Sequence, residues 1–203
     1  MNNIFKTNLA LILAAIITGL IVSIIAQFFI VTAKSIFSYL YTSPLTVDVY
    51  NLELNILPLL ACSLAAILIS VVIKINNIKR WHGIADSIYA ANQRRGVLDV
   101  KMGLLSTLVS FFSISGGASV GIYGPLVHFG ATVGVILRRI TFMPNIPHDI
   151  IIGSGVAAAI SAGFGSPIAG IIFAHEVVLR HFSLKAITSI AICSFTANIT
   201  ATK

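Results

Sequence analysis

The chain has 203 residues, of which 57% are hydrophobic and only 9% are charged, and its mean hydropathy is +1.00. Soluble domains usually carry about a quarter charged residues, so this composition excludes an ordinary soluble protein and indicates an integral membrane protein. The formal charge of +7 does not indicate a nucleic-acid partner, because the basic residues cluster at the ends of apolar segments. We expect a single transmembrane domain over residues 1–203, in contact with the lipid bilayer.

The first two apolar segments predict membrane-crossing helices. Leu9–Phe37 is too long for the core of a signal peptide. At helical rise it also exceeds a hydrocarbon core of about 30 Å, so this helix should tilt steeply or bend. Thr42–Glu53 is expected to be a polar loop, and Leu54–Ile75 is the second predicted span.

Basic residues are unevenly distributed around the second span. Six of the thirteen Lys and Arg residues lie between Lys74 and Lys101, whereas residues 41–55 contain none. The positive-inside rule therefore predicts that residues 76–101 are cytoplasmic and residues 41–55 lie outside, in a multi-pass protein of the cell's inner or plasma membrane. Arg94–Arg95 and Arg138–Arg139 are interpreted as topology anchors.

The middle of the chain alternates short helices with glycine-rich breaks. Trp81–Val100 is too polar to cross a membrane, and in it Gly83 precedes a predicted short helix, Ile84–Asn92. Lys101–Ser115 predicts another helix. The glycines of residues 116–124 predict a broken backbone. Pro125 then predicts a helix N-terminus near Tyr123–Pro125, because proline suits a first helical turn.

The C-terminal third continues this pattern. Ile150–Gly163 is a helix of small residues, the composition that lets membrane helices pack closely. We expect a break at Gly163–Pro167 and a further helix from Pro167 to Leu179. Leu184–Ile199 is the last apolar segment.

Two of the apolar runs are short for membrane spans. Leu126–Leu137 and Ile168–Leu179 each cover about 18 Å at helical rise. Half-spanning helices that begin at Gly/Pro breaks are typical of the midplane substrate sites of transporters. Their N-termini favour an anion. The predicted chemistry is anion coordination by backbone N–H groups and hydroxyls, without a cofactor.

Three stretches together resemble the CLC family of chloride channels and proton-coupled chloride transporters. The family motif GSGIP falls on Trp81–Ala85, read here as WHGIA, and GREGP falls on Gly121–Pro125, read as GIYGP. The third stretch, Ser154–Glu176, ends in GFGSPIAGIIFAHE. The resemblance covers about residues 9–200. It implies an all-α integral membrane fold, with tilted and half-spanning helices like the first inverted repeat of that family.

The resemblance also implies where an anion would bind and which groups are changed there. His82 stands where the family has its anion-binding serine, and Tyr123 stands at the gating glutamate. Val177 aligns with the internal proton-transfer glutamate of the antiporting members. The implied anion-binding residues are His82, Gly83, Ile84, Gly121, Ile122, Tyr123, Gly124 and Pro125.

These substitutions lead to our functional hypothesis, a channel-like permeation of a chloride-type anion that is not coupled to protons. No carboxylate stands at positions 123 and 177. An ordinary phenol titrates near pH 10, which makes it a poor proton carrier. Tyr123 is expected to donate its hydroxyl to an anion or to block the path.

Only the first of the family's two inverted halves is matched, which leaves several interpretations open. The chain is a fragment, a partner of a second-half subunit or of another copy in a homodimer, or a degenerate relic. A different class of function is a non-conducting membrane scaffold or partner subunit. A remote third is an intramembrane hydrolase, suggested by Gly153-Ser154-Gly155 and several histidines.

Other polar residues have plainer interpretations. His82 beside Trp81 fits a membrane interface as well as a ligand. His128 and His175 are interpreted as satisfied structural histidines, and Glu176 as a buried carboxylate paired with Arg180 at i+4. The five histidines lack metal-ligand spacing, so no metal site is expected. Cys62 and Cys193 are interpreted as packing residues.

Overall fold

The computed structural model describes residues 2–42, 45–49, 52–93, 98–140 and 147–202. The prediction of an all-α membrane fold is confirmed, apart from one small hairpin. The helices are α1 (Asn2–Thr42), α2 (Leu57–Asn76), α3 (Ile84–Asn92), α4 (Val100–Ser115), α5 (Tyr123–Ile140), α6 (His148–Phe164), α7 (Pro167–Phe173) and α8 (Leu184–Ala201), with a π-helix, η1 (Ala174–Leu179), directly after α7. The predicted anchor Arg94–Arg95 lies outside the described residues.

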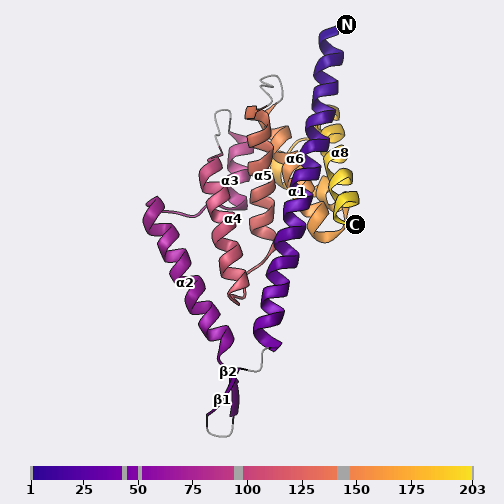
Figure 1. Cartoon of the computed structure of the whole chain (residues 1–203). Coiled ribbons are helices and arrows are strands. Elements are labelled where there is room, and N and C mark those ends of the chain that lie inside the picture. Colours follow the sequence, from indigo (N-terminus) through magenta and orange to yellow (C-terminus); the bar gives the residue numbers. More distant parts are fainter. Residues whose placement is uncertain (1, 43–44, 50–51, 94–97, 141–146, 203) are drawn as a thin grey trace.

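Helix α1 is continuous over 41 residues and runs along the length of the molecule (Figure 1). The prediction of a polar loop at Thr42–Glu53 is partly wrong, because strands β1 (Thr46–Val49) and β2 (Leu52–Asn55) form an antiparallel hairpin there. The hairpin pairs Thr46 with Asn55 and lies at the end of the molecule opposite the N-terminus (Figure 1). Each strand alternates apolar and polar residues, a period-2 signal that the prediction overlooked.

Three helices of the described chain are long and apolar enough to cross a membrane, namely α1 from Leu9 onward, α2 and α8. The chain is an integral membrane protein on this evidence. Helix α5 begins at Tyr123, as predicted, and extends beyond the short apolar run Leu126–Leu137 at both ends to 18 residues, about 27 Å. Its added residues are polar or small at one end and include Arg138 and Arg139 at the other.

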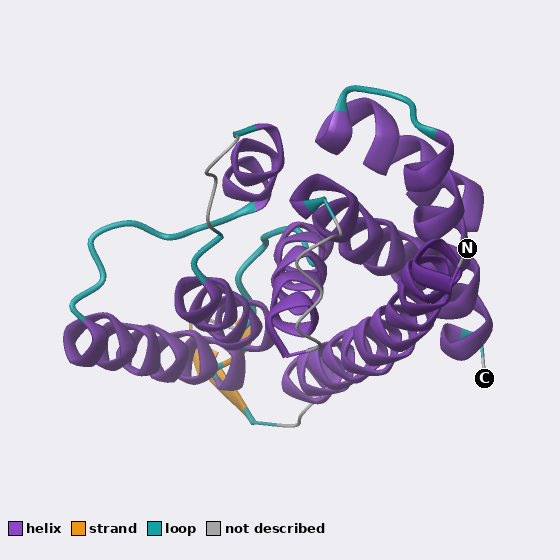
Figure 2. Cartoon of the chain, turned by 90° about the horizontal axis from the view of Figure 1, so that it is seen from above, coloured by secondary structure: helices purple, strands orange, loops and turns teal. Residues whose placement is uncertain are grey.

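Helix α6 lies at the centre of the fold and packs against α1, α3, α5, α7, α8 and η1. Figure 2 shows the helices from above. Every residue of α6 from Ile150 to Ala162 is buried. A Cβ added at Gly155 would collide with the carbonyl oxygen of Gly130 in α5, so the two backbones touch where both residues are glycine. The predicted close packing of this small-residue helix is confirmed.

Helix α2 occupies a peripheral position. Only Ala65 on this helix is buried, and α2 diverges from the other helices toward its C-terminal end (Figure 1). Its contact with the bundle is close at one point, where Ala65 Cβ lies 2.5 Å from the place that a Cβ at Gly116 would take. Bulky apolar side chains cover the rest of its surface, in the way expected of a helix that faces lipid.

Both predicted backbone breaks are confirmed. Residues 116–122 between α4 and α5 are not helical, and Gly117 has a φ of 101° that glycine adopts readily. Helix α6 ends on Gly165, at φ 66°, whose N–H donates to the carbonyl oxygen of Ser161 (2.9 Å). The Ser166 hydroxyl then accepts from the Ala169 N–H and caps α7. The π-helix η1 was not predicted.

Candidate anion site

The three motif stretches meet in space. A Cβ at Gly124 would lie 3.9 Å from Cδ1 of Ile84, which brings the N-terminus of α5 against that of α3. A Cβ at Gly163 would lie 2.9 Å from Cδ1 of Tyr123, which brings the same end of α5 against the C-terminal end of α6. Helix ends from residues 81–85, 121–125 and 154–176 therefore converge on one place.

The N-terminus of α3 is held by an internal hydrogen bond and an ion pair. Gly83 is extended (φ −153°), and its N–H donates to Oδ2 of Asp86 (2.8 Å). The Arg80 guanidinium pairs with Oδ1 of the same carboxylate. Burial alone would raise the pKa of Asp86, but the Gly83 N–H and the charges of His82 and Arg80 together lower it below its ordinary value. Asp86 is therefore an anion whose charge Arg80 offsets.

Two histidines lie side by side behind this helix end. The ring centroids of His82 and His128 are 6.4 Å apart. Nδ1 of His128 shares a hydrogen bond of 2.7 Å with the Ser87 hydroxyl, and the His82 N–H donates to the Ser106 hydroxyl (3.2 Å). Within the described chain, His82 Nδ1 and His128 Nε2 are buried and have no hydrogen-bond partner. His128 is thus only half satisfied, contrary to the structural interpretation.

Tyr123 is the first residue of α5, and its ring is held by the end of α6. It stacks on Phe164 with centroids 4.0 Å apart and an interplanar angle of 27°. The absence of a side chain at Gly163 makes room for the ring. The ring therefore occupies a fixed position where the three stretches converge, and moving it requires breaking this stack.

The other predicted positions of the second motif lie around Tyr123. Gly121 is exposed with open space around its Cα, and Ile122 packs against the apolar core. Pro125 is the third residue of α5, in the first turn as predicted. Gly124 makes the contact with Ile84.

The third stretch differs from its prediction at the acidic position. Glu176 is exposed on η1, not buried. Among the described residues, ion pairs join Arg80 to Asp86 and His181 to Asp149, and Glu176 does not pair with Arg180. The i+4 spacing fails because the backbone here is a π-helix and Arg180 has a left-handed φ of 60°. Val177 is half-buried in the same turn.

Helix η1 is also bonded to the C-terminal end of α3. The Asn92 side chain at the end of α3 donates to the carbonyl oxygen of Val178 (2.8 Å). The neighbouring His175 is buried and stacks on Phe182, with centroids 4.9 Å apart. Its Nδ1 lies 3.4 Å from the His181 carbonyl oxygen, and its Nε2 has no partner among the described residues. His175 is therefore not a fully satisfied structural histidine either.

Two other chemistries find little support in these contacts. The Ser154 hydroxyl is buried and bonds the Ser189 hydroxyl (3.1 Å), so its bonded neighbour is a serine and not the basic group that a nucleophile requires. Among the described residues, no three His, Cys, Asp or Glu side chains lie together as metal ligands would. Cys193 is buried and Cys62 is exposed, and both are free thiols.

A family profile described as "Voltage gated chloride channel" matches residues 64–202, more than half of the chain and all three motif stretches. The chain belongs to this family. The resemblance that the three motifs indicated is therefore confirmed. The family is one of membrane proteins that transport chloride.

Individual relatives agree. A protein of Ralstonia nicotianae named "Putative chloride channel protein ClcB-like" is 31% identical over 121 residues, which are 58% of this chain and 28% of that protein. The "H(+)/Cl(-) exchange transporter 5" of Oryctolagus cuniculus is 33% identical over 96 residues, 46% of this chain and 12% of that protein. The chain thus spans well under half the length of these two relatives.

A solved structure supports the fold. The crystal structure of a slow cyanobacterial Cl−/H+ antiporter matches with a TM-score of 0.71, over 94% of this chain and 46% of that one, at 19% sequence identity. The chain has the CLC fold over about half of that antiporter. At this identity the likeness concerns fold alone.

Several residues that shape the site were missed by sequence reasoning. Asp86 had an available signal, because an acidic residue three positions after Gly83 fits the start of a helix. No sequence signal pointed to Ser87 and Ser106, since their partners His128 and His82 are 41 and 24 residues away. Phe164, the stacking partner of Tyr123, is likewise remote in sequence.

Proposed function

We propose that this chain forms part of an anion-permeation pathway for chloride or a similar small anion, channel-like and not coupled to protons. Residues 1–203 would act as one transmembrane domain. The observation that carries the proposal is the convergence of the helix ends at Ile84 and Gly124, with the Tyr123 ring in the position of the family's gating carboxylate.

The proposed anion ligands come from both helix ends, and they are not equivalent. His82, through its buried and unpartnered Nδ1, is the side chain we assign to the anion on the α3 side. The Gly83 N–H already donates to Asp86, so Gly83 gives the loop its shape and Ile84 begins the helix. On the α5 side, Tyr123 is assigned the hydroxyl donor. The companion residues there are Gly121, Ile122, Gly124 and Pro125.

The absence of proton coupling is proposed from two side chains. Some relatives are named H(+)/Cl(-) exchange transporters, a name for an activity that couples the movement of protons to that of chloride. In this chain, residue 123 is a phenol packed on Phe164, and residue 177 is a valine that cannot carry a proton. A carboxylate is therefore missing at both positions where the family resemblance expects one.

We propose further that a second membrane segment completes the pathway, supplied by another copy in a homodimer or by a second-half subunit. The support is that the fold matches 46% of the solved antiporter. In the same proposal, residues 76–101 face the cytoplasm of a cell's inner or plasma membrane.

The test is anion efflux from liposomes that contain the 203-residue chain, with and without a pH gradient. We expect flux that discriminates among anions and does not change with the gradient. Uphill proton movement driven by a chloride gradient would refute the proposal.

Two variants locate the pathway in the same assay. Tyr123→Phe keeps the stack on Phe164 and removes only the hydroxyl, so we expect anion affinity to fall about ten-fold or more, the effect of one hydrogen bond to a charged group. Tyr89→Phe, at an exposed tyrosine on α3, is the matched control and should leave affinity unchanged. Equal effects of the two substitutions would place the anion away from Tyr123.

The second candidate is a non-conducting scaffold or partner subunit, favoured by the Tyr123–Phe164 stack, which fills the meeting point of the helix ends. It predicts no flux from the wild-type chain and none from Tyr123→Ala, together with a stable assembly in size-exclusion chromatography. Flux that appears only in Tyr123→Ala would instead identify a pathway that the ring blocks.

A further inference from the structure

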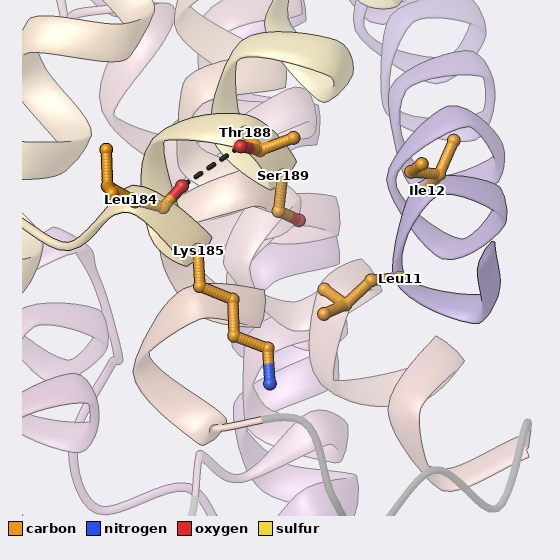
Figure 3. A pocket seen from close by; sticks show the side chains of 6 residues that line it. All are labelled: Leu11, Ile12, Leu184, Lys185, Thr188 and Ser189. Atoms are coloured by element: carbon orange, nitrogen blue, oxygen red, sulfur yellow. Dashed lines mark hydrogen bonds between the residues drawn. The ribbon is translucent and has the colours of Figure 1, made fainter. Parts of the chain in front are cut away.

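A cavity outside the candidate anion site lies between α1 and α8. Its volume is about 440 Å³, and Figure 3 shows Leu11 and Ile12 on α1 opposite the residues of α8. The lining is apolar on the α1 side and mixed on the α8 side, from which Leu184, Lys185, Thr188 and Ser189 contribute. None of these residues belongs to the three motif stretches.

The position of the cavity along the two helices sets its depth in the membrane. The apolar span of α8 begins at Leu184, and the α8 residues that line the cavity all lie within the first six residues of this span. Hydrocarbon gives way to lipid headgroups at the ends of such spans. The cavity therefore lies at the headgroup level, on the side opposite the β-hairpin (Figure 1).

The polar groups of the cavity differ in whether they are already used. The Thr188 hydroxyl donates to the Leu184 carbonyl oxygen (2.9 Å, dashed in Figure 3), and the Ser189 hydroxyl bonds Ser154. The Lys185 ammonium has neither a hydrogen bond nor an ion pair within the described chain. One cation with three unused donors thus stands beside an apolar wall.

We propose that this cavity binds an anionic phospholipid, with the lipid phosphate on Lys185 and an acyl chain along Leu11 and Ile12. A phospholipid joins a negative phosphate to a hydrocarbon chain, and the cavity places a positive group beside apolar side chains. Leu184 is 86% exposed at the cavity mouth and offers further surface to the acyl chain. A zwitterionic lipid such as phosphatidylcholine carries the same phosphate, but the ammonium group of its headgroup offsets the negative charge that pairs with Lys185.

The test measures lipid binding to the purified full chain by native mass spectrometry, with phosphatidylglycerol and phosphatidylcholine compared at equal concentration. We expect phosphatidylglycerol to be retained more strongly, and Lys185→Ala to lower its affinity about five-fold, the effect of one cation at a membrane surface. Lys74→Ala is the matched control, because Lys74 is an exposed lysine at the end of the α2 span. It should leave binding unchanged.

A second variant tests the apolar half. Ile12 is 37% exposed, so Ile12→Trp fills the cavity from the α1 side and leaves Lys185 in place. It should reduce phosphatidylglycerol binding while the circular dichroism spectrum remains that of the wild type.

Four results would overturn the proposal. They are equal retention of the two lipids, no effect of Lys185→Ala, displacement of the lipid by soluble glycerol phosphate, and conversion of a dimer to a monomer by Ile12→Trp. The third result would identify a site for a free anion, and the fourth an interface between two copies of the chain.

Discussion

Helices α6 and α2 are both strongly apolar, yet they occupy opposite environments. Helix α6 is buried from Ile150 to Ala162 and is built largely of Gly, Ala and Ser. Helix α2 is rich in Leu, Ile and Val, and only Ala65 is buried. Lipid tails are as apolar as leucine, so association in a membrane depends on close packing and polar contacts between helices. In this protein, bulky residues accordingly face lipid and small residues face protein.

The serines of the two helices show the same difference. In α6 the Ser161 hydroxyl donates to the Ser194 carbonyl oxygen of α8 (2.7 Å). In α2 the Ser63 and Ser70 hydroxyls donate to carbonyl oxygens of their own helix, four residues earlier. The Ser161 side chain on α6 thus links two helices, whereas the serine side chains on α2 form hydrogen bonds only within their own helix.

The largest expected effect comes from adding the same bulk to both helices. Ala158→Leu introduces three carbons at a fully buried position of α6 and should cost about 3 kcal/mol or more, because the neighbouring helices cannot move apart freely. Ala66→Leu makes the same change at an exposed position of α2 and should stay within about 0.5 kcal/mol. Unfolding by SDS titration, followed by circular dichroism, measures both. Similar losses would mean that α2 is packed against a partner.

A substitution at the C-terminal end of a helix should have an intermediate effect on the free energy of unfolding. Helix α6 ends on Gly165 (φ 66°) and α2 on Asn77 (φ 50°), both left-handed. Gly165→Ala should cost about 1–2 kcal/mol, because a Cβ is disfavoured in that conformation. Gly83→Ala is the control, since Gly83 also has open space around it but a φ of −153°. If the two glycine substitutions cost the same in the SDS titration, backbone strain at Gly165 is not the cause.

The smallest expected effect concerns the serines. Ser161→Ala removes the hydrogen bond between α6 and α8 and should cost about 0.6 kcal/mol, the mean for such bonds in a membrane bundle. Ser70→Ala removes a bond within α2 and should be near zero. The same unfolding assay applies to both. A larger loss for Ser70→Ala would contradict the contrast between the two helices.

Sequence reasoning predicted the features of this fold that depend on neighbouring residues. Gly117, Gly165 and Pro167 break the helices where expected, because their backbone preferences are local. The start of α3 after Gly83 was also predicted to the residue. The hairpin was missed because four-residue strands give a weak signal beside two long apolar segments.

Contacts between distant residues could not be predicted in the same way. The pairing of His82 with His128, and the stack of Tyr123 on Phe164, depend on how α3, α5 and α6 cross. The error at Glu176 has another cause. A fixed i+4 spacing was assumed, but η1 has the wider turn of a π-helix. The assignment of the anion ligands remains a prediction that the flux experiment tests.

The length of α1 has a mechanical consequence for the two membrane faces. Its 41 residues extend about 62 Å, roughly twice the hydrocarbon thickness. Even at a tilt of about 40°, the steep end of the usual range, some 26 residues cross the hydrocarbon and about 15 project beyond it. Over this length, a change of about 10° in the tilt of the helix displaces one end relative to the other by about 11 Å. The β-hairpin that follows its C-terminal end would therefore move when a change of tilt begins near the N-terminus.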